Sequence, residues 1–151
     1  MSEHAVKIAW ERTTDDFKYE TYTRNHRWTF VEKGVSVPAS AAPAFLGESG
    51  HVDPEEALLA SLSSCHMLTF LAVAAKKRLV VDRYEDDAVG QLAKDESGQW
   101  AITRVVLRPQ IVFGGDAQPT PEQIEQMHHL AHQECFIANS VRTEVVVESP
   151  K

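Results

Sequence analysis

The chain has 151 residues, of which 43% are hydrophobic and 25% are charged, and its net charge is -7. These values are typical of one globular domain that can bury a hydrophobic core without disulfide staples. The negative charge argues against a nucleic-acid-binding protein, which needs a basic face for phosphate contacts, and more weakly against binding to anionic membranes. We therefore expect a single domain over residues 1–151, with neither nucleic acid nor a membrane as its partner.

The N-terminus and the cysteine count indicate the cellular compartment. The first ten residues, MSEHAVKIAW, lack the basic start and apolar core of a signal peptide. The longest apolar run, residues 67–75, is shorter than the roughly 20 residues of a membrane-spanning helix, and three basic residues follow it. Two cysteines are too few for a disulfide framework. We expect a cytoplasmic protein. In that compartment a cysteine pair is more often reactive than structural.

The first third of the chain predicts three strands and a loop. Three segments alternate polar and apolar residues or carry β-branched and aromatic residues, with turn-forming residues between them: residues 5–10, 18–23 and 27–31. Residues 36–50, with two prolines and two glycines, predict a loop that crosses the surface.

A long helix is predicted next. Asp53 is its cap, Pro54 takes the first helical position, and Glu56 closes a capping box. Residues 57–75 are apolar on nearly all sides, and the basic residues 76–78 suit the negative end of the helix. A helix this apolar needs cover on more than one side, which a partner subunit could supply.

The remaining segments predict a hairpin, a second helix and a closing strand. Residues 79–92 and 100–112 form the hairpin around a turn at residues 95–98. A second capping box begins at Thr120, and residues 143–148 read as an alternating strand. The predicted order is β-β-β-α-β-β-α-β with a long buried central helix. Because the strands are grouped, the predicted fold class is α+β.

Cys65 follows a run of serines in the long helix, and two interpretations of it stay open. Most free cysteines are small buried hydrophobic residues. Alternatively, Ser61, Ser63 and Ser64 mark a polar helix start, where aligned backbone N–H groups favour a thiolate. The second cysteine, Cys135, also lies by a predicted helix end.

Glu55 lies ten residues before Cys65. In a straight helix this spacing corresponds to about 15 Å of rise, so the two side chains could not meet. If they share a site, the helix must break, and we predict the break at residues 61–64.

Residues 23–27 form a polar cluster, TRNHR, with two interpretations. It is either a hairpin turn with solvated charges or a segment that holds an arginine over a thiolate. In the second case, a carboxylate such as Glu55 would pair with the guanidinium, and the pair would lower the pKa of the cysteine.

Three histidines in the two predicted helices are candidate metal ligands or catalytic bases: His66, His128 and His132. His128, His132 and Cys135 fall on roughly one side of a helix, but no flanking cysteine pair or His-Glu-x-x-His pattern accompanies them, so we predict no metal site. His66 points about 100° away from Cys65 on a helix. It is therefore a poor candidate base, which disfavours a cysteine-nucleophile hydrolase.

Several segments resemble the osmotically inducible protein C / organic hydroperoxide resistance (OsmC/Ohr) family. These are residues 53–60, DPEEALLA, followed by Cys65-His66, the helix continuation at residues 67–72, and Cys135 with Asn139-Ser140 after it. The order of segments is similar over nearly the whole chain. Phe136 stands where the family often has proline, and the glycine-rich setting of the Ohr arginine is absent, so the chain resembles OsmC more than Ohr.

The resemblance implies a thiol-dependent peroxidase that reduces organic hydroperoxides without a cofactor or metal. Cys65 would be the peroxidatic cysteine and Cys135 the cysteine that resolves it as an intramolecular disulfide. Arg24 would be the family's arginine and Glu55 its partner. The resemblance also implies an intertwined homodimer with two sites at the subunit interface, reset by a lipoyl-type or thioredoxin-like dithiol.

A competing hypothesis keeps the same cysteine pair without catalysis. The protein would then be a redox sensor or small-molecule-binding protein whose partner reads its oxidation state. Four apolar residues of the long helix either line an access route for organic peroxides or belong to the core: Leu62, Met67, Leu68 and Phe70.

Overall fold

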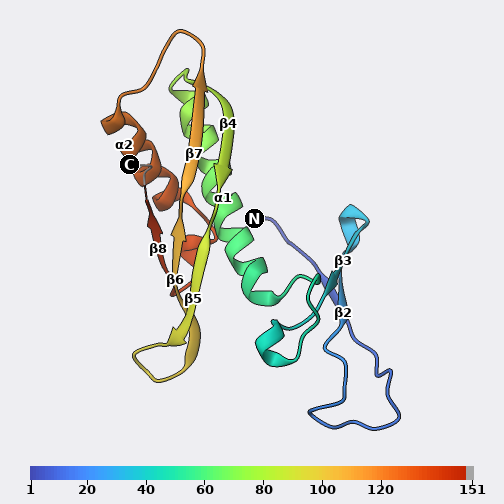
Figure 1. Ribbon diagram of the computed structural model, residues 1–151. Helices are drawn as coiled ribbons and strands as arrows, with labels where there is room; N and C mark the ends of the chain where they lie inside the picture. The colour runs from blue at the N-terminus through green and yellow to red at the C-terminus, as the bar shows by residue number, and fades with distance from the viewer. Residues whose placement is uncertain (149–151) are drawn as a thin grey trace. The chain divides into compact units, whose positions relative to one another are not determined.

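The computed structural model describes residues 1–148, which divide into two compact units, residues 1–57 and the residues from 58 onward (Figure 1). The last three residues of the predicted domain, 149–151, lie outside the described part. One helix, α1 (Pro54–Lys76), begins in the first unit and continues into the second. The single domain over residues 1–151 stays a prediction, and each unit is described separately.

The first unit contains a three-stranded antiparallel sheet in the order β1 (Lys7–Ala9), β2 (His26–Phe30) and β3 (Val35–Ala39). A 3-10 turn (Val31–Lys33) and Gly34 connect β2 to β3. Gly34 has a φ of 64°, a left-handed conformation that glycine adopts without a Cβ clash. The predicted loop at residues 36–50 is wrong at its start, because strand β3 extends to Ala39.

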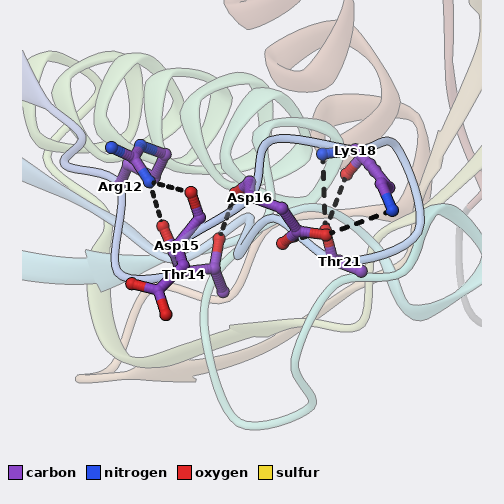
Figure 2. A network of polar contacts seen from close by, with 6 residues as sticks. All are labelled: Arg12, Thr14, Asp15, Asp16, Lys18 and Thr21. Atoms are coloured by element: carbon purple, nitrogen blue, oxygen red, sulfur yellow. Dashed lines mark hydrogen bonds and ion pairs between the residues drawn. The ribbon is translucent and has the colours of Figure 1, made fainter.

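Residues 18–23 do not form the predicted strand. The backbone N–H groups of Thr21 and Tyr22 both donate to the carbonyl of Lys18, at 3.0 and 3.1 Å. Figure 2 shows the polar network of this loop, in which the Thr21 hydroxyl donates to Asp16 and the Arg12 guanidinium donates to backbone carbonyls. Such local hydrogen bonds offer the backbone an alternative to a sheet ladder. The aromatic residues that suggested a strand cluster with one another instead.

Helix α1 starts as predicted. The Asp53 carboxylate accepts a hydrogen bond from the backbone N–H of Glu56 at 2.8 Å, as an N-cap does. The return bond from the Glu56 side chain is not among the hydrogen bonds of residues 1–148, so only half of the predicted capping box forms.

The predicted break at residues 61–64 is wrong, because α1 runs without interruption from Pro54 to Lys76. The hydroxyls of Ser61 and Ser64 donate to the helix's own carbonyls, and Ser63 donates to Asp86. Serines satisfied in this way do not need to end a helix. Cys65 consequently lies in the middle of α1, and the argument that a helix N-terminus activates it does not hold.

Only one stripe of α1 is buried in a single chain. Its members are spaced by four residues, as one face of a helix requires: Leu62, His66, Phe70 and Ala74. Leu68, on another side, is 63% exposed. The whole helix has the length and composition of a membrane span, which the apolar run of residues 67–75 alone does not reach. Core helices of soluble folds meet the same criterion. The predicted long buried helix is thus buried along one stripe.

The second unit contains five strands. They are β4 (Val80–Asp86), β5 (Val89–Lys94), β6 (Trp100–Leu107), β7 (Pro109–Gly114) and β8 (Glu144–Val147). Strand β4 pairs with β7 and β5 pairs with β6, all antiparallel, and β8 joins β6 in parallel. The predicted long hairpin therefore has the correct partners but splits into two sheets. The observed order is β-β-β-α-β-β-β-β-α-β, and the predicted α+β class is confirmed.

Helix α2 (Pro121–Glu134) begins with the complete predicted capping box between Thr120 and Gln123 and ends at Cys135, its C-cap. Two buried clusters hold α1 in this unit. Phe70 and Ala74 of α1 pack with Met127 and Ala131 of α2, and Leu62 packs with Val105 and Leu107 of β6. Burying each large apolar side chain is worth about 1.5–3 kcal/mol. Leu62 and Phe70 therefore belong to the core of the single chain.

Candidate functional site

The two cysteines come together in the second unit. Cys65 projects from the middle of α1 and Cys135 caps the end of α2, and Cys65 is close enough to raise the pKa of the Cys135 thiol. Both thiols are free. Cys65 is half-buried, whereas Cys135 is only 1% exposed. Of the pair, Cys65 is therefore the thiol that a reagent from solvent reaches first.

The surroundings of the Cys135 thiol favour its protonated form. Burial raises the pKa of the Cys135 thiol, and the neighbouring Cys65 raises it further. The backbone N–H of Ala138 donates to the Cys135 sulfur at 3.4 Å and opposes the rise in part.

A buried histidine pair lies next to Cys65 in the chain. Nε2 of His66 and Nδ1 of His128 are 3.0 Å apart, and the two rings are stacked with an interplanar angle of 11°. The pKa of each ring is lowered to about 4, mainly by burial; His128 and His132 add to the shift at His66, and Asp86 opposes the shift at His128. Both rings are therefore neutral near pH 7.

The histidine pair bears on two of the hypotheses from the sequence. His66 bonds to His128, and no hydrogen bond among residues 1–148 joins a histidine to Cys65. The suspected triad of His128, His132 and Cys135 does not form a ligand set, since the described residues contain no group of three or more His, Cys, Asp or Glu side chains placed to hold a metal ion.

Arg24 and Glu55 come together in the first unit, where both line a cavity of about 590 Å³. The other candidate arginine, Arg27, is exposed on β2 and donates to Ser36 at 3.3 Å. The cavity wall is mostly apolar and rich in aromatic rings. Its lining residues are Ile8, Trp10, Phe17, Tyr22, Thr23, Arg24, His26, Ser40, Ala41, Ala42, Phe45, Pro54 and Glu55.

The Arg24 guanidinium is held by aromatic faces and carbonyls. Its central carbon lies 3.8 Å from the ring centroid of Tyr22 and 4.8 Å from that of Tyr19. Its nitrogens donate to the carbonyls of these two residues, each at 2.5 Å. No ion pair among residues 1–148 joins it to Glu55, the partner that the resemblance implies. Within the described part of the chain, the guanidinium therefore has no carboxylate at ion-pair distance.

The aromatic wall of this cavity was missed in the sequence. Trp10, Phe17 and Tyr22 contact one another with ring centroids 5.0 to 6.2 Å apart. The sequence signal for this wall is the density of aromatic residues between residues 10 and 22, a pattern that also indicates strand propensity. A wall of this kind suits an apolar ligand, and Arg24 suits an oxygen atom carried by it.

The structure thus brings Arg24 and Glu55 to one cavity in the first unit and Cys65 and Cys135 together in the second. Along the unbroken α1 helix, Glu55 and Cys65 are ten residues, or about 15 Å, apart. These two side chains of one helix do not meet at a common point.

Comparison with protein families assigns the chain to a family. The family described as OsmC-like protein matches residues 47–149, which is more than half of the sequence. The chain belongs to the OsmC-like protein family. Its cysteine pair and its helix α1 both lie in the matched region.

Solved structures extend this OsmC-like fold over the first unit as well. An OsmC-like protein of unknown function from Vibrio cholerae is 51% identical, with a TM-score of 0.95 over 99% of this chain and 100% of the other. An organic hydroperoxide resistance protein OsmC from Legionella pneumophila is 16% identical, with a TM-score of 0.72 over 99% and 96%. The organic hydroperoxide resistance protein of Bacillus subtilis is 19% identical, with a TM-score of 0.69 over 99% and 98%. At such low identity, the last two show the fold alone. None of the curated proteins matches the chain.

The buried histidine pair predicts a loss of stability in acid. In the unfolded chain each ring takes up a proton near pH 6.5, whereas in the folded protein His66 and His128 do so only near pH 4. The unfolded state therefore binds more protons between these values, and the free energy of unfolding falls as the pH drops from 6.5 toward 4. The fall is at most about 1.4 kcal/mol per pH unit for each ring. Urea unfolding at several pH values measures it.

Two variants test whether the histidine pair causes this dependence, and the control residue, His129, lies beside His128 on α2. The double variant His66→Leu/His128→Met should show a flatter dependence of unfolding free energy on pH, whereas His129→Gln, at an exposed position, should match the wild type. An equal slope in the double variant and the wild type would show that the pair is not responsible.

Proposed function

We propose that this OsmC-like protein is a thiol-dependent peroxidase that reduces organic hydroperoxides to alcohols. One observation carries the proposal: two free thiols are neighbours, and one of them is accessible while the other is buried. A peroxidase of this type needs one thiol that reacts with the peroxide and a second thiol close enough to form a disulfide with it. The names of the Legionella and Bacillus proteins, which share the fold, support the choice of substrate class.

In the first step, the thiolate of Cys65 attacks the outer oxygen of a hydroperoxide, ROOH. A sulfur–oxygen bond forms, the O–O bond breaks, and Cys65 becomes a sulfenic acid. The leaving alkoxide, RO⁻, takes up a proton and departs as the alcohol. Arg24 supplies the positive charge that stabilises the negative charge developing on oxygen.

In the second step, the sulfur of Cys135 attacks the sulfur of the Cys65 sulfenic acid. A disulfide forms, hydroxide leaves, and the thiol proton of Cys135 converts it to water. The raised pKa of Cys135 keeps this thiol protonated in the resting protein, which leaves the attack on the peroxide to Cys65. A lipoyl-type or thioredoxin-like dithiol then reduces the disulfide by exchange and is itself oxidised. We place this cycle in the cytoplasm, where such dithiols keep thiols reduced.

We further propose that the working form is a homodimer whose two sites lie at the subunit interface. Glu55 and Cys65 are separated along an unbroken helix, so a site that uses both needs residues from two chains. Much of α1 is apolar yet uncovered in one chain, with Leu68 63% exposed. A second copy would cover this surface and bring the Arg24 cavity of one chain to the Cys65 of the other.

Peroxide consumption tests the catalytic proposal. With a dithiol present, the wild type should consume cumene hydroperoxide faster than hydrogen peroxide, Cys65→Ser should be inactive, and Cys135→Ser should lose multiple turnover. Arg24→Ala should lower kcat/KM by about 10²–10³, as the loss of an oxyanion donor does. Arg27→Ala is the matched control and should keep full activity, because Arg27 is exposed outside the cavity.

If the wild type consumes neither peroxide faster than the free dithiol does, the peroxidase proposal fails. The same cysteine pair would then have to be studied as a redox sensor or binding site.

Light scattering after size exclusion tests the dimer. Leu68→Glu places a charge on the uncovered side of α1 and should convert the dimer to a monomer, because an unpaired charge is costly to bury in an interface. Leu130→Glu makes the same change on α2, at a residue that is 39% exposed, and should leave the mass unchanged. A wild-type protein that elutes as a monomer at all concentrations would contradict the proposal.

A further inference from the structure

We propose that His26 is a positioning residue that fixes the backbone of Arg24 through a hydrogen-bond relay from Trp28. The inference rests on the proposed function, because it assigns a residue to the work of Arg24. All of the residues involved lie in the first unit, where Arg24 stands two residues before the start of β2 and is not itself part of the sheet.

The relay begins in the middle of the sheet. Trp28 lies in the central strand β2, where it is paired with Ile8 of β1 and Val37 of β3. His26 is two residues earlier, so its side chain lies on the same face of the strand. The indole nitrogen of Trp28 lies 2.9 Å from Nε2 of His26, and Nδ1 of His26 lies 2.7 Å from the carbonyl oxygen of Arg24.

The partners determine the protonation of the imidazole. An indole N–H only donates, so Nε2 of His26 accepts from Trp28. A carbonyl oxygen only accepts, so Nδ1 of His26 carries a proton and donates it to Arg24. Both bonds form together only with the neutral imidazole that is protonated on Nδ1. Trp28 thereby selects the tautomer that holds Arg24.

The relay matters because it acts with a second bond on the other side of Arg24. The indole N–H of Trp10 donates to the carbonyl of Thr23 at 2.7 Å. The Thr23 carbonyl belongs to the peptide plane before Arg24, and the Arg24 carbonyl belongs to the plane after it. Because peptide groups are planar, fixing both planes fixes the two backbone dihedrals of Arg24 and hence the direction of its side chain. The preceding loop contains no strand from residue 10 to residue 25 that would do this.

Two substitutions of His26 each keep only one of its two hydrogen bonds, either the bond to the Arg24 carbonyl or the bond from Trp28. In His26→Asn the amide nitrogen takes the place of Nδ1 and can still donate to the Arg24 carbonyl. In His26→Gln the longer side chain puts its amide near the place of Nε2, where it can accept from Trp28 but does not reach the carbonyl. We expect His26→Asn to keep kcat/KM for cumene hydroperoxide within about 3-fold and His26→Gln to lower it by about 10- to 100-fold, as small misplacements of a catalytic group do.

Three further measurements distinguish positioning from other roles. The rate at which a dithiol reduces the disulfide should be the same in both variants, because Arg24 acts on the peroxide step. In an Arg24→Ala background, His26→Gln should cause no further loss; an undiminished loss there would show that His26, which also lines the cavity, acts on the substrate directly. Nitrogen NMR of the His26 ring should show a protonated Nδ1 and an unprotonated Nε2.

The outcomes are distinct. A wild type without peroxidase activity overturns the proposed function and, with it, the role of His26. An active wild type whose two His26 variants have equal kcat/KM overturns the positioning role alone. An Nε2-protonated ring in the wild type overturns the relay whatever the kinetics show.

Discussion

The packing of α1 against α2 is the contact that brings the two cysteines of this protein together. Phe70 and Ala74 on one helix meet Met127 and Ala131 on the other, and this contact puts Cys65 beside the Cys135 at the end of α2. Neither cysteine is special in its own helix: Cys65 is in mid-helix and Cys135 is a C-cap. The two thiols differ in burial, and burial raises the pKa of Cys135. A loss of core packing would therefore remove the pair as effectively as a change in either cysteine.

The first unit holds the arginine that the proposed reaction uses. Its cavity combines an aromatic wall with one guanidinium, and that guanidinium is held by the faces and carbonyls of Tyr19 and Tyr22. Residues 10–25 have no regular strand, so the arginine depends on side chains that reach back from the sheet, namely Trp10 and His26. The apolar and uncovered parts of α1 give a physical reason for a second chain to complete the site.

Local sequence signals predicted the features that depend on local chemistry. The caps of α1 and α2 follow from Asp53 and Thr120, and the α+β class follows from grouped strands and two helices. The failures came where tertiary or nonlocal contacts decide. Residues 18–23 alternate like a strand but form a hydrogen-bonded loop with an aromatic cluster, and the serines at 61–64 resemble a helix start but bond to carbonyls and to the distant Asp86. The pairing of Cys65 with Cys135 came from the family resemblance, because no local pattern indicates which helices pack together.

The central claim is that Cys65 and Cys135 of one chain form a disulfide when the protein meets an organic hydroperoxide. The most direct test is to treat the reduced protein with one equivalent of cumene hydroperoxide, block the remaining thiols, and analyse non-reduced peptides by mass spectrometry. The account predicts a peptide pair linked through Cys65 and Cys135, in protein that runs as a single chain on a non-reducing denaturing gel. Two blocked thiols, or chains linked to each other, would contradict it.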